Sequence, residues 1–244
     1  MNKHLKAEIY RTLHTGNYFI YYLICVAAIF AVLFGTNVNT ENYDFRILVT
    51  NMSQFSSMIV GTGLGTMLAI IQSELYSSRM YFYEIMDGAK THHIICSKLM
   101  TQFLLSLIYV VPTTVGMFLV LKKYGAQEMA HPWVAVLLYA LITVHVCLRI
   151  ALLTMMVGKR LIAVIIPYAL TMLEVVPMIL QELLQPTSFP LPQSILHWFP
   201  TLQMMQLFEM CNNTGYIVRV VLSFVLNIAL LYGIVYRKYR KKRF

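Results

Sequence analysis

The chain has 244 residues, of which 59% are hydrophobic and only 12% are charged. A water-soluble domain of this composition would have too few polar residues to cover its surface, so the composition indicates an integral membrane protein. The net charge is +9, but six of the 19 basic residues lie in the last eight positions, which favours a basic anchor at the membrane edge and no nucleic-acid partner.

Residues 1–17 are the first predicted element, an amphipathic helix. Leu5, Ile9 and Leu13 recur at helical spacing, and the basic residues lie largely on other faces. Such a helix would lie in the headgroup layer as an elbow before the first span, with a plain polar tail as the alternative. The apolar run that follows has no convincing small-residue cleavage site, so we expect a retained span rather than a cleaved signal peptide.

Six apolar runs approach the roughly 20 residues that a helix needs to cross a hydrocarbon core of about 30 Å. Because these runs are apolar on all sides, they indicate helices rather than the alternating strands of a barrel. The sequence therefore predicts an all-α integral membrane protein, with a single transmembrane domain of residues 1–244 and six transmembrane helices. The runs cover approximately residues 18–36, 52–71, 99–121, 132–157, 161–181 and 217–236.

The basic residues of the connections predict the orientation in the membrane. The N-terminal segment, the connection 72–98, the turn at Lys159 and Arg160 and the basic tail 237–244 together hold 14 of them. The connections on the other side hold three, with Arg219 at their membrane edge. Cytoplasmic connections carry the excess of Lys and Arg, so both termini and the connection 72–98 are expected in the cytoplasm.

The connection 72–98 is the most charge-dense long connection of the chain. Its acidic and basic residues are mixed with aromatic ones, which is typical of a surface that a soluble partner grips. We expect a cytoplasmic coupling loop between the second and third spans, and a loop packed on itself is the alternative. The candidate coupling residues are Glu74, Tyr76, Arg79, Tyr81, Tyr83, Glu84, Asp87 and Lys90.

Two further segments stand out along the chain. The second run contains GTGLGT, residues 61–66, which lacks the Lys-Ser/Thr of a phosphate-binding loop and instead suits close packing against another helix. The segment 182–216 contains four prolines followed by an apolar stretch that is too short to span. This pattern predicts an external re-entrant or interfacial segment, with an ordinary amphipathic surface loop as the alternative.

Three polar residues fall at membrane depth, where charge is costly and therefore informative. His145 and Arg149 are one helical turn apart in the fourth run, and Glu174 in the fifth run is within reach of the long Arg149 side chain. We expect a cluster of His145, Arg149 and Glu174 that pairs these two helices. It would act as a structural clamp, as the lining of a substrate path or as a proton relay.

Known catalytic patterns are missing from the sequence. It contains no HExxH, GxSxG or GxxxxGK[ST] motif, and the adjacent His92 and His93 would point about 100° apart on a helix. The four cysteines lack CxxC spacing. We therefore expect no catalytic residue, no metal and no cofactor in this chain. The energy for any uphill transport must come from a partner or an ion gradient.

This combination resembles the permease subunits of type-2 ATP-binding-cassette exporters. It is most similar to the small bacterial permeases for antimicrobial-peptide export or self-immunity, such as phenol-soluble modulin exporters. That family has an elbow helix, six spans, a coupling loop after the second span and a re-entrant segment, here 196–207, before the last. The matching loop residues are Glu74, Tyr76, Ser77, Ser78, Lys90, Ser97 and Lys98.

The resemblance implies a permease dimer in the bacterial plasma membrane, with the same or a different permease as second copy. Two ATPase subunits, which hold the ATP and Mg, would dock on the cytoplasmic loops. The substrate would be an amphipathic or antimicrobial peptide or a lipid-like molecule. The alternative is a gradient-driven secondary transporter that uses the cluster of His145, Arg149 and Glu174, and the missing motifs disfavour an intramembrane enzyme.

Overall fold

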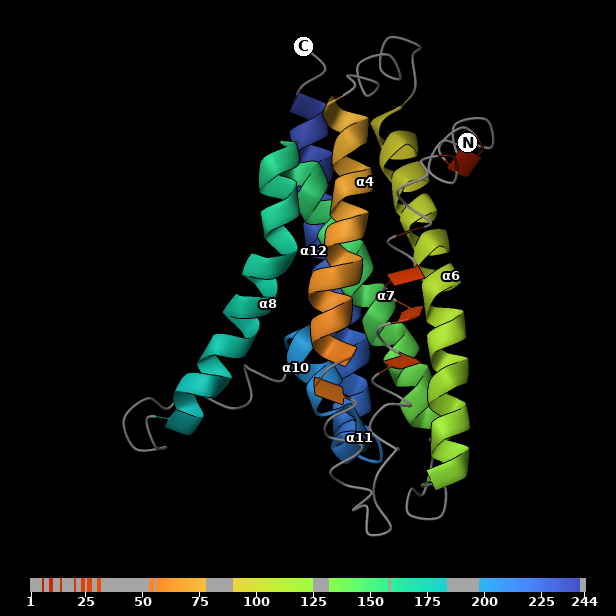
Figure 1. Ribbon diagram of the computed structural model, residues 1–244. Coiled ribbons are helices and arrows are strands. Elements are labelled where there is room, and N and C mark those ends of the chain that lie inside the picture. The colour runs from red at the N-terminus through yellow and green to blue at the C-terminus, as the bar shows by residue number, and fades with distance from the viewer. Residues whose placement is uncertain are drawn as a thin grey trace.

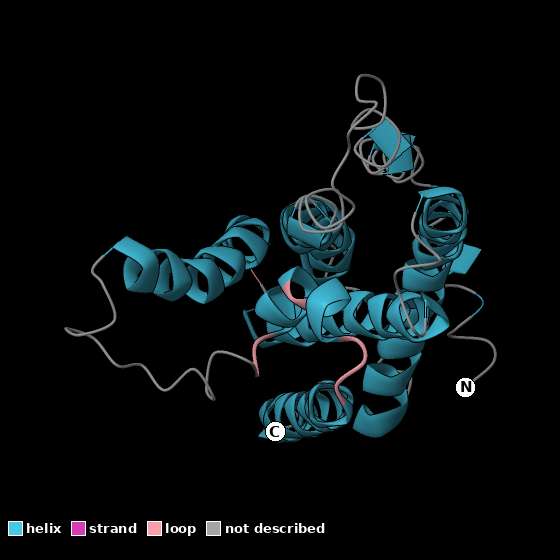
Figure 2. Cartoon of the chain, turned by 90° about the horizontal axis from the view of Figure 1, so that it is seen from below, coloured by secondary structure: helices cyan, strands magenta, loops and turns pink. Residues whose placement is uncertain are grey.

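The protein is described here by a computed structural model. It covers residues 53–54, 56–77, 90–124, 132–157, 159–183 and 198–241, together with scattered positions between 6 and 31. These residues are almost entirely helical and contain no strand (Figure 2). The elements are η1 (Ile59–Leu64), α4 (Gly65–Ser77), α6 (Thr91–Tyr124), α7 (Pro132–Val157), α8 (Arg160–Leu183), α10 (Pro200–Met205), α11 (Leu207–Met210) and α12 (Thr214–Lys241).

Among the described residues, four helices are long and apolar enough to cross a membrane. They comprise Ser56–Ser73, Thr91–Leu119, Pro132–Val157 and Thr214–Lys241, and Leu161–Val176 is a shorter apolar helix. The predicted helical class of a membrane-embedded chain is confirmed, whereas the count of six spans is not. The predicted elbow 1–17 and the run 18–36 lie outside the described residues except for scattered helical positions.

Several predicted boundaries were wrong because the helices continue past their apolar runs. The connection 72–98 is shorter than predicted, since α4 continues to Ser77 and α6 begins at Thr91. The segment 182–216 is likewise trimmed by α8 and α12, and residues 237–241 of the basic tail belong to α12. A helix pairs its main-chain groups whether or not its side chains are apolar, so hydropathy alone does not mark its ends.

Helix α7 is the centre of the bundle, with α4, α6 and α12 packed against it (Figure 1). Residues 142–148 are all buried, so every face of this part of the helix meets protein. Its span has a mean hydropathy of 2.3, which suits a helix enclosed on all sides. By contrast, only 11% of the most apolar window of α12 is buried, so that helix lies at the periphery.

Glycines bring α8 close to the helix formed by η1 and α4. A Cβ added at Gly61 would lie 2.6 Å from Thr171 Oγ1, and one added at Gly65 would lie 3.2 Å from Pro167 Cβ. Both pairs are spaced four residues apart, so one row of small residues faces one row on α8. This contact confirms the packing role predicted for GTGLGT.

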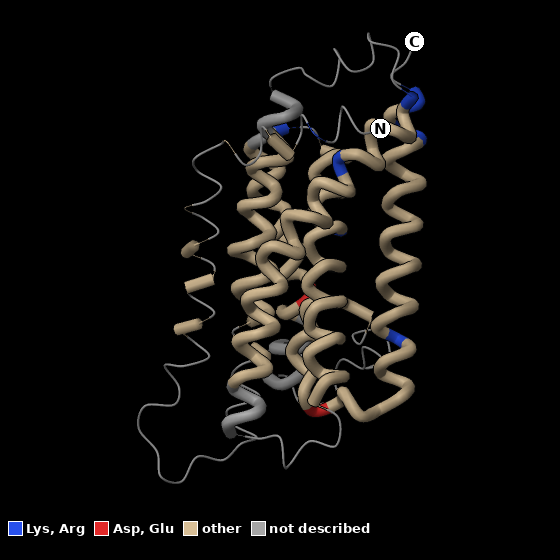
Figure 3. The backbone as a smooth tube through the Cα atoms, turned by 90° about the vertical axis from the view of Figure 1, so that its right-hand side faces the viewer, with Lys and Arg blue, Asp and Glu red and all other residues tan. Residues whose placement is uncertain are grey.

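One end of the bundle gathers the end of α4, the start of α6 and the end of α12 (Figure 1). Lysines and arginines of the described residues are concentrated toward the same end (Figure 3). There Lys238 Nζ donates to Met156 O, which joins the end of α12 to the last turn of α7. Gln102 Nε2 donates to Gln72 Oε1 at 2.9 Å, a buried contact that ties α6 to α4.

Candidate functional site

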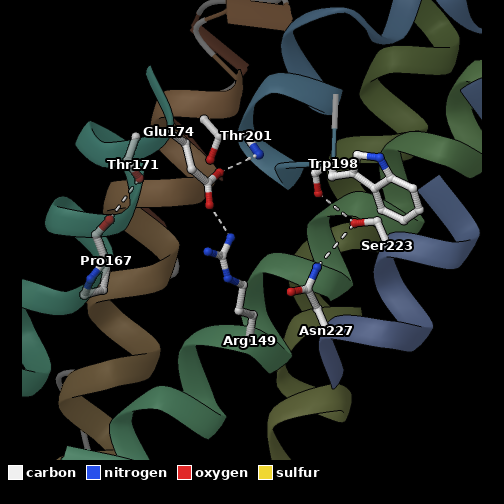
Figure 4. Close-up of polar contacts among 8 residues, drawn as sticks. All are labelled: Arg149, Pro167, Thr171, Glu174, Trp198, Thr201, Ser223 and Asn227. Carbon is white, nitrogen blue, oxygen red and sulfur yellow. Dashed lines mark hydrogen bonds and ion pairs between the residues drawn. The ribbon is translucent and has the colours of Figure 1, made fainter. Parts of the chain in front are cut away.

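The candidate site is an ion pair inside the bundle. Arg149 lies eight residues before the end of α7, about 12 Å, and Glu174 lies 14 residues after the start of α8, about 21 Å. The two helices run antiparallel across a short turn, and side chains lean toward the N-terminus of their own helix. The two side chains therefore lean toward each other, and Arg149 Nη1 donates to Glu174 Oε1 (Figure 4).

The second carboxylate oxygen of Glu174 holds the buried helix α10. Glu174 Oε2 accepts the main-chain N–H of Thr201 at 3.0 Å. Thr201 follows Pro200 in the first turn of α10, where N–H groups have no partner within the helix. No side chain of the N-cap residue, Phe199, caps this helix. Glu174 thus supplies the cap from another helix, and its negative charge suits the positive end of α10.

The pair is enclosed but not fully sealed. The side chain of Glu174 is 3% exposed and that of Arg149 is 15% exposed. A cavity of about 10 Å³ adjoins them, with room for about one water molecule. In this conformation the cavity cannot admit a peptide or a lipid headgroup. It is lined by Gly61, Val146, Arg149, Ile150, Pro167, Leu170, Thr171, Glu174 and Thr201.

His145 does not join the pair, which corrects the three-residue cluster predicted from the sequence. Its ring meets the edge of Phe224 on α12, with 5.4 Å between ring centroids. Neither ring nitrogen has a hydrogen-bond partner among the residues that the structure describes. His145 lies at about the depth of Glu174, as the residue count from the turn predicted. The direction of its side chain, however, decides which residue it contacts. His145 is directed to α12 and Arg149 to α8.

Helix α10 and the start of α11 are buried between the long helices. Five consecutive residues, 200–204, are buried, and so are Leu207, Phe208 and Cys211. Protein therefore covers α10, as irregular main chain at membrane depth would require, and the predicted re-entrant or interfacial character of the whole segment 182–216 stays a prediction.

Hydrogen bonds from α12 and from the start of the second-run helix hold the main chain of this segment. Ser223 Oγ donates to Trp198 O at 2.9 Å (Figure 4). The hydroxyl of Tyr216 donates to Gln203 O. Ser53 Oγ donates to Met205 O at 2.7 Å. Together with Glu174, these contacts fix both ends of α10.

The predicted coupling residues are only partly described. Glu74 and Tyr76 belong to α4 rather than to a loop, and Lys90 is exposed directly before α6. The other five predicted residues, Arg79, Tyr81, Tyr83, Glu84 and Asp87, lie outside the described residues. The coupling role of all eight therefore stays a prediction.

Sequence reasoning missed the Thr201 cap and the contact between Gln72 and Gln102. Pro200 signals a helix start with free N–H groups, but only the tertiary arrangement shows that a carboxylate from α8 meets them. Among the described residues, no three His, Cys, Asp or Glu side chains gather as metal ligands.

Comparisons of the chain with protein-family models, with curated proteins and with solved structures find no match.

Proposed function

We propose that the chain is the membrane permease subunit of an ATP-driven ABC exporter. It would move amphipathic or antimicrobial peptides, or lipid-like molecules, across or out of a bacterial plasma membrane, with both termini in the cytoplasm. The observation that carries the proposal is the short helix α10, buried among membrane-length helices and held by the ion pair of Arg149 and Glu174. Buried charges are costly in a membrane and are typical of functional elements.

The arrangement of α4 and α6 supports a coupling role for the residues between them. Both helices reach the end of the bundle that is rich in lysine and arginine, and Gln72 is bonded to Gln102 across them. A force applied to residues 78–89 would therefore move both helices together. Because basic residues favour the cytoplasmic side, a cytoplasmic ATPase is the partner that fits this end.

Packing provides a route from that end to the buried segment. Helix α4 meets α8 through Gly65, α8 carries Glu174, and Glu174 caps α10 at Thr201. Movement of α4 would thus shift α8 and strain the hold on α10. A change of this kind is a population shift between two packed states, which ATP binding to the partner would drive.

The chain itself supplies no catalytic residue in this proposal. Two ATPase subunits hydrolyse ATP with Mg, and a second permease copy completes the transporter. Membrane lipids surround the exposed apolar faces of α8 and α12, where residues such as Leu173 and Leu230 lie outward.

The test is co-purification of an ATPase subunit from the native membrane in mild detergent. Reversal of charge at Glu84 and Asp87 to arginine should release the ATPase, because both acidic residues are expected to meet basic residues on it. The matched control is Glu209→Arg, an exposed acid on α11 at the opposite end of the bundle, which should leave co-purification unchanged.

Three outcomes separate the proposals. Release by the double reversal but not by the control supports the coupling role. Retention of the ATPase by both variants moves the contact elsewhere. If no ATPase co-purifies with the unaltered protein and transport follows a proton gradient without nucleotide, the chain is a secondary transporter.

A further inference from the structure

The helix that runs from Ser56 to Ser77 changes its winding inside the bundle. Residues Ile59–Leu64 form the π-helix η1, and the flanking residues Met58 and Gly65 keep right-handed helical dihedral angles. The N–H of Gly65 bonds to Val60 O, five residues back, which is the bond of a π-turn. A π-turn holds one residue more than an α-turn. Every residue after it is therefore displaced by one position relative to a regular α-helix.

Two threonine hydroxyls occupy main-chain oxygens of this turn. Thr62 Oγ1 donates to Met58 O at 2.6 Å, and Thr66 Oγ1 donates to Thr62 O. A hydroxyl that bonds to the carbonyl four residues back competes with the main-chain N–H that a regular α-turn would place there. The switch proposed below uses these two hydroxyls to favour the π-turn over the α-turn.

The residues before the π-turn are anchored by polar contacts. Ser53 Oγ donates to Met205 O at 2.7 Å, and Ser56 Oγ donates to the hydroxyl of Tyr139 at 2.9 Å. Both serines are buried, so these bonds are not exchanged with solvent. If the π-turn is lost, the part of the helix that moves is α4.

We propose that η1 is a register switch that couples α4 to α8. Conversion of the π-turn to an α-turn would advance α4 by one residue, roughly 1.5 Å along its axis and roughly 100° about it. Leu64 would then take the position of Gly65. A Cβ at that position already lies 2.4 Å from Ile150 Cδ1 and 3.2 Å from Pro167 Cβ. A leucine fits there only if the Ile150 side chain on α7 turns aside and α8, which carries Pro167, moves away.

Displacement of α8 reaches the buried segment through one side chain. Glu174 moves with α8, and its carboxylate bonds to Arg149 on α7 and to the N–H of Thr201 on α10. The switch would therefore strain both contacts of Glu174 together, the one with Arg149 and the one with Thr201. Its role in transport rests on the proposed function, but the register change itself is a property of this chain and is tested without an ATPase.

The same change replaces one buried contact between α4 and α6 by another. Gln72 now faces Gln102, and after conversion Ile71 occupies that position. Two double-cysteine variants report the two registers, Gln72→Cys with Gln102→Cys for the π-turn and Ile71→Cys with Gln102→Cys for the α-turn. Both are made in a background whose four native cysteines are replaced by alanine.

The experiment cross-links each pair in the purified, membrane-reconstituted chain with a short, membrane-permeant bis-methanethiosulfonate. Thr62→Val with Thr66→Val removes the hydroxyls that favour the π-turn and keeps side-chain shape. We expect the ratio of the Ile71 product to the Gln72 product to rise roughly fivefold, as for loss of about one ordinary hydrogen bond. Serine at both positions retains the hydroxyls and should restore the original ratio.

A matched control is Thr114→Val on α6. That hydroxyl also donates to main-chain oxygens, Val110 O at 2.8 Å and Val111 O at 2.9 Å, but in an α-helix that contains Pro112 and no π-turn. It should leave the ratio unchanged. An unaltered ratio in the Thr62 and Thr66 double variant overturns the switch, as does an equal rise in the control. If the double variant does not fold, Thr66→Val alone carries the test, with the same decision.

Discussion

Replacement of Glu174 by glutamine removes one charge of the buried pair while keeping the size of the side chain. The amide oxygen can still accept the N–H of Thr201, so the interaction that is lost is the one with Arg149. Removal of one partner of a buried ion pair costs about 3–5 kcal/mol, since the remaining charge is left uncompensated. Arg149 keeps 15% side-chain exposure. We therefore expect the lower limit, a loss of about 3 kcal/mol in the free energy of unfolding.

A double-mutant cycle measures this interaction directly. The variants are Arg149→Met, Glu174→Gln and their combination, unfolded by sodium dodecyl sulfate in mixed micelles and followed by circular dichroism. Because methionine carries no charge, the combined variant should lose about 2 kcal/mol less than the sum of the two single losses. Glu209→Gln, at an exposed acid on α11, is the control and should change stability by less than about 0.5 kcal/mol.

Additive single losses would refute direct coupling between Arg149 and Glu174. The combined variant also separates two roles for the pair. If the pair is a clamp, the combined variant regains both stability and transport. If the pair lines a substrate path, stability returns and transport does not.

Three further outcomes follow from the packing. Gly61→Ala should lower the free energy of unfolding by about 1–3 kcal/mol, because its Cβ would meet a threonine hydroxyl of α8 at 2.6 Å. Gly233→Ala, whose Cβ would have nothing within 4 Å, should be neutral in the same unfolding assay. Equal effects of the two variants would contradict this contact. Ser223→Ala should lower the free energy of unfolding by about 0.5–1 kcal/mol, because it removes the hydrogen bond to the main-chain oxygen of Trp198 ahead of α10. The same change should shift tryptophan fluorescence, and unchanged emission would contradict this. Burial raises the pKa of the Cys211 thiol, so less thiolate forms at neutral pH. A maleimide should therefore modify the less buried Cys96 before Cys211, which should react only at higher pH or after denaturation. Peptide mass spectrometry would show the order of modification.

The sequence predicted the helical positions that depend on hydropathy and depth. The run 132–157 coincides with α7, because this helix is apolar from end to end and is enclosed by protein. The contact between Arg149 and Glu174 followed from counting residues on either side of a short turn, since an α-helix rises by a fixed amount per residue. Glycine spacing likewise indicated close helix packing at Gly61 and Gly65, although it does not identify α8 as the partner.

Features that depend on direction and long-range partners were not predicted. The start of α6 was missed because polar residues such as His92 and Lys98 resemble a loop by hydropathy, although Lys98 is buried in the helix. The direction of His145 toward Phe224 depends on where α12 packs, which no local pattern contains. The π-turn at Ile59–Leu64 was also not predicted, since GTGLGT indicated only close packing against another helix.

The ion pair also has a consequence for how the chain enters the membrane during synthesis. Helices α7 and α8 are consecutive and are separated only by residues 158–159, so the translocation machinery receives them almost together. If these two helices cross the membrane, neither Arg149 nor Glu174 alone is well tolerated in lipid, but as a hairpin each masks the other's charge before any later helix arrives. Helix α12, which anchors the segment 198–213 through Ser223, is synthesised later. Nascent chains arrested after α8 and before α12 should therefore hold an inserted hairpin of α7 and α8, with α10 still lacking its contacts with α12.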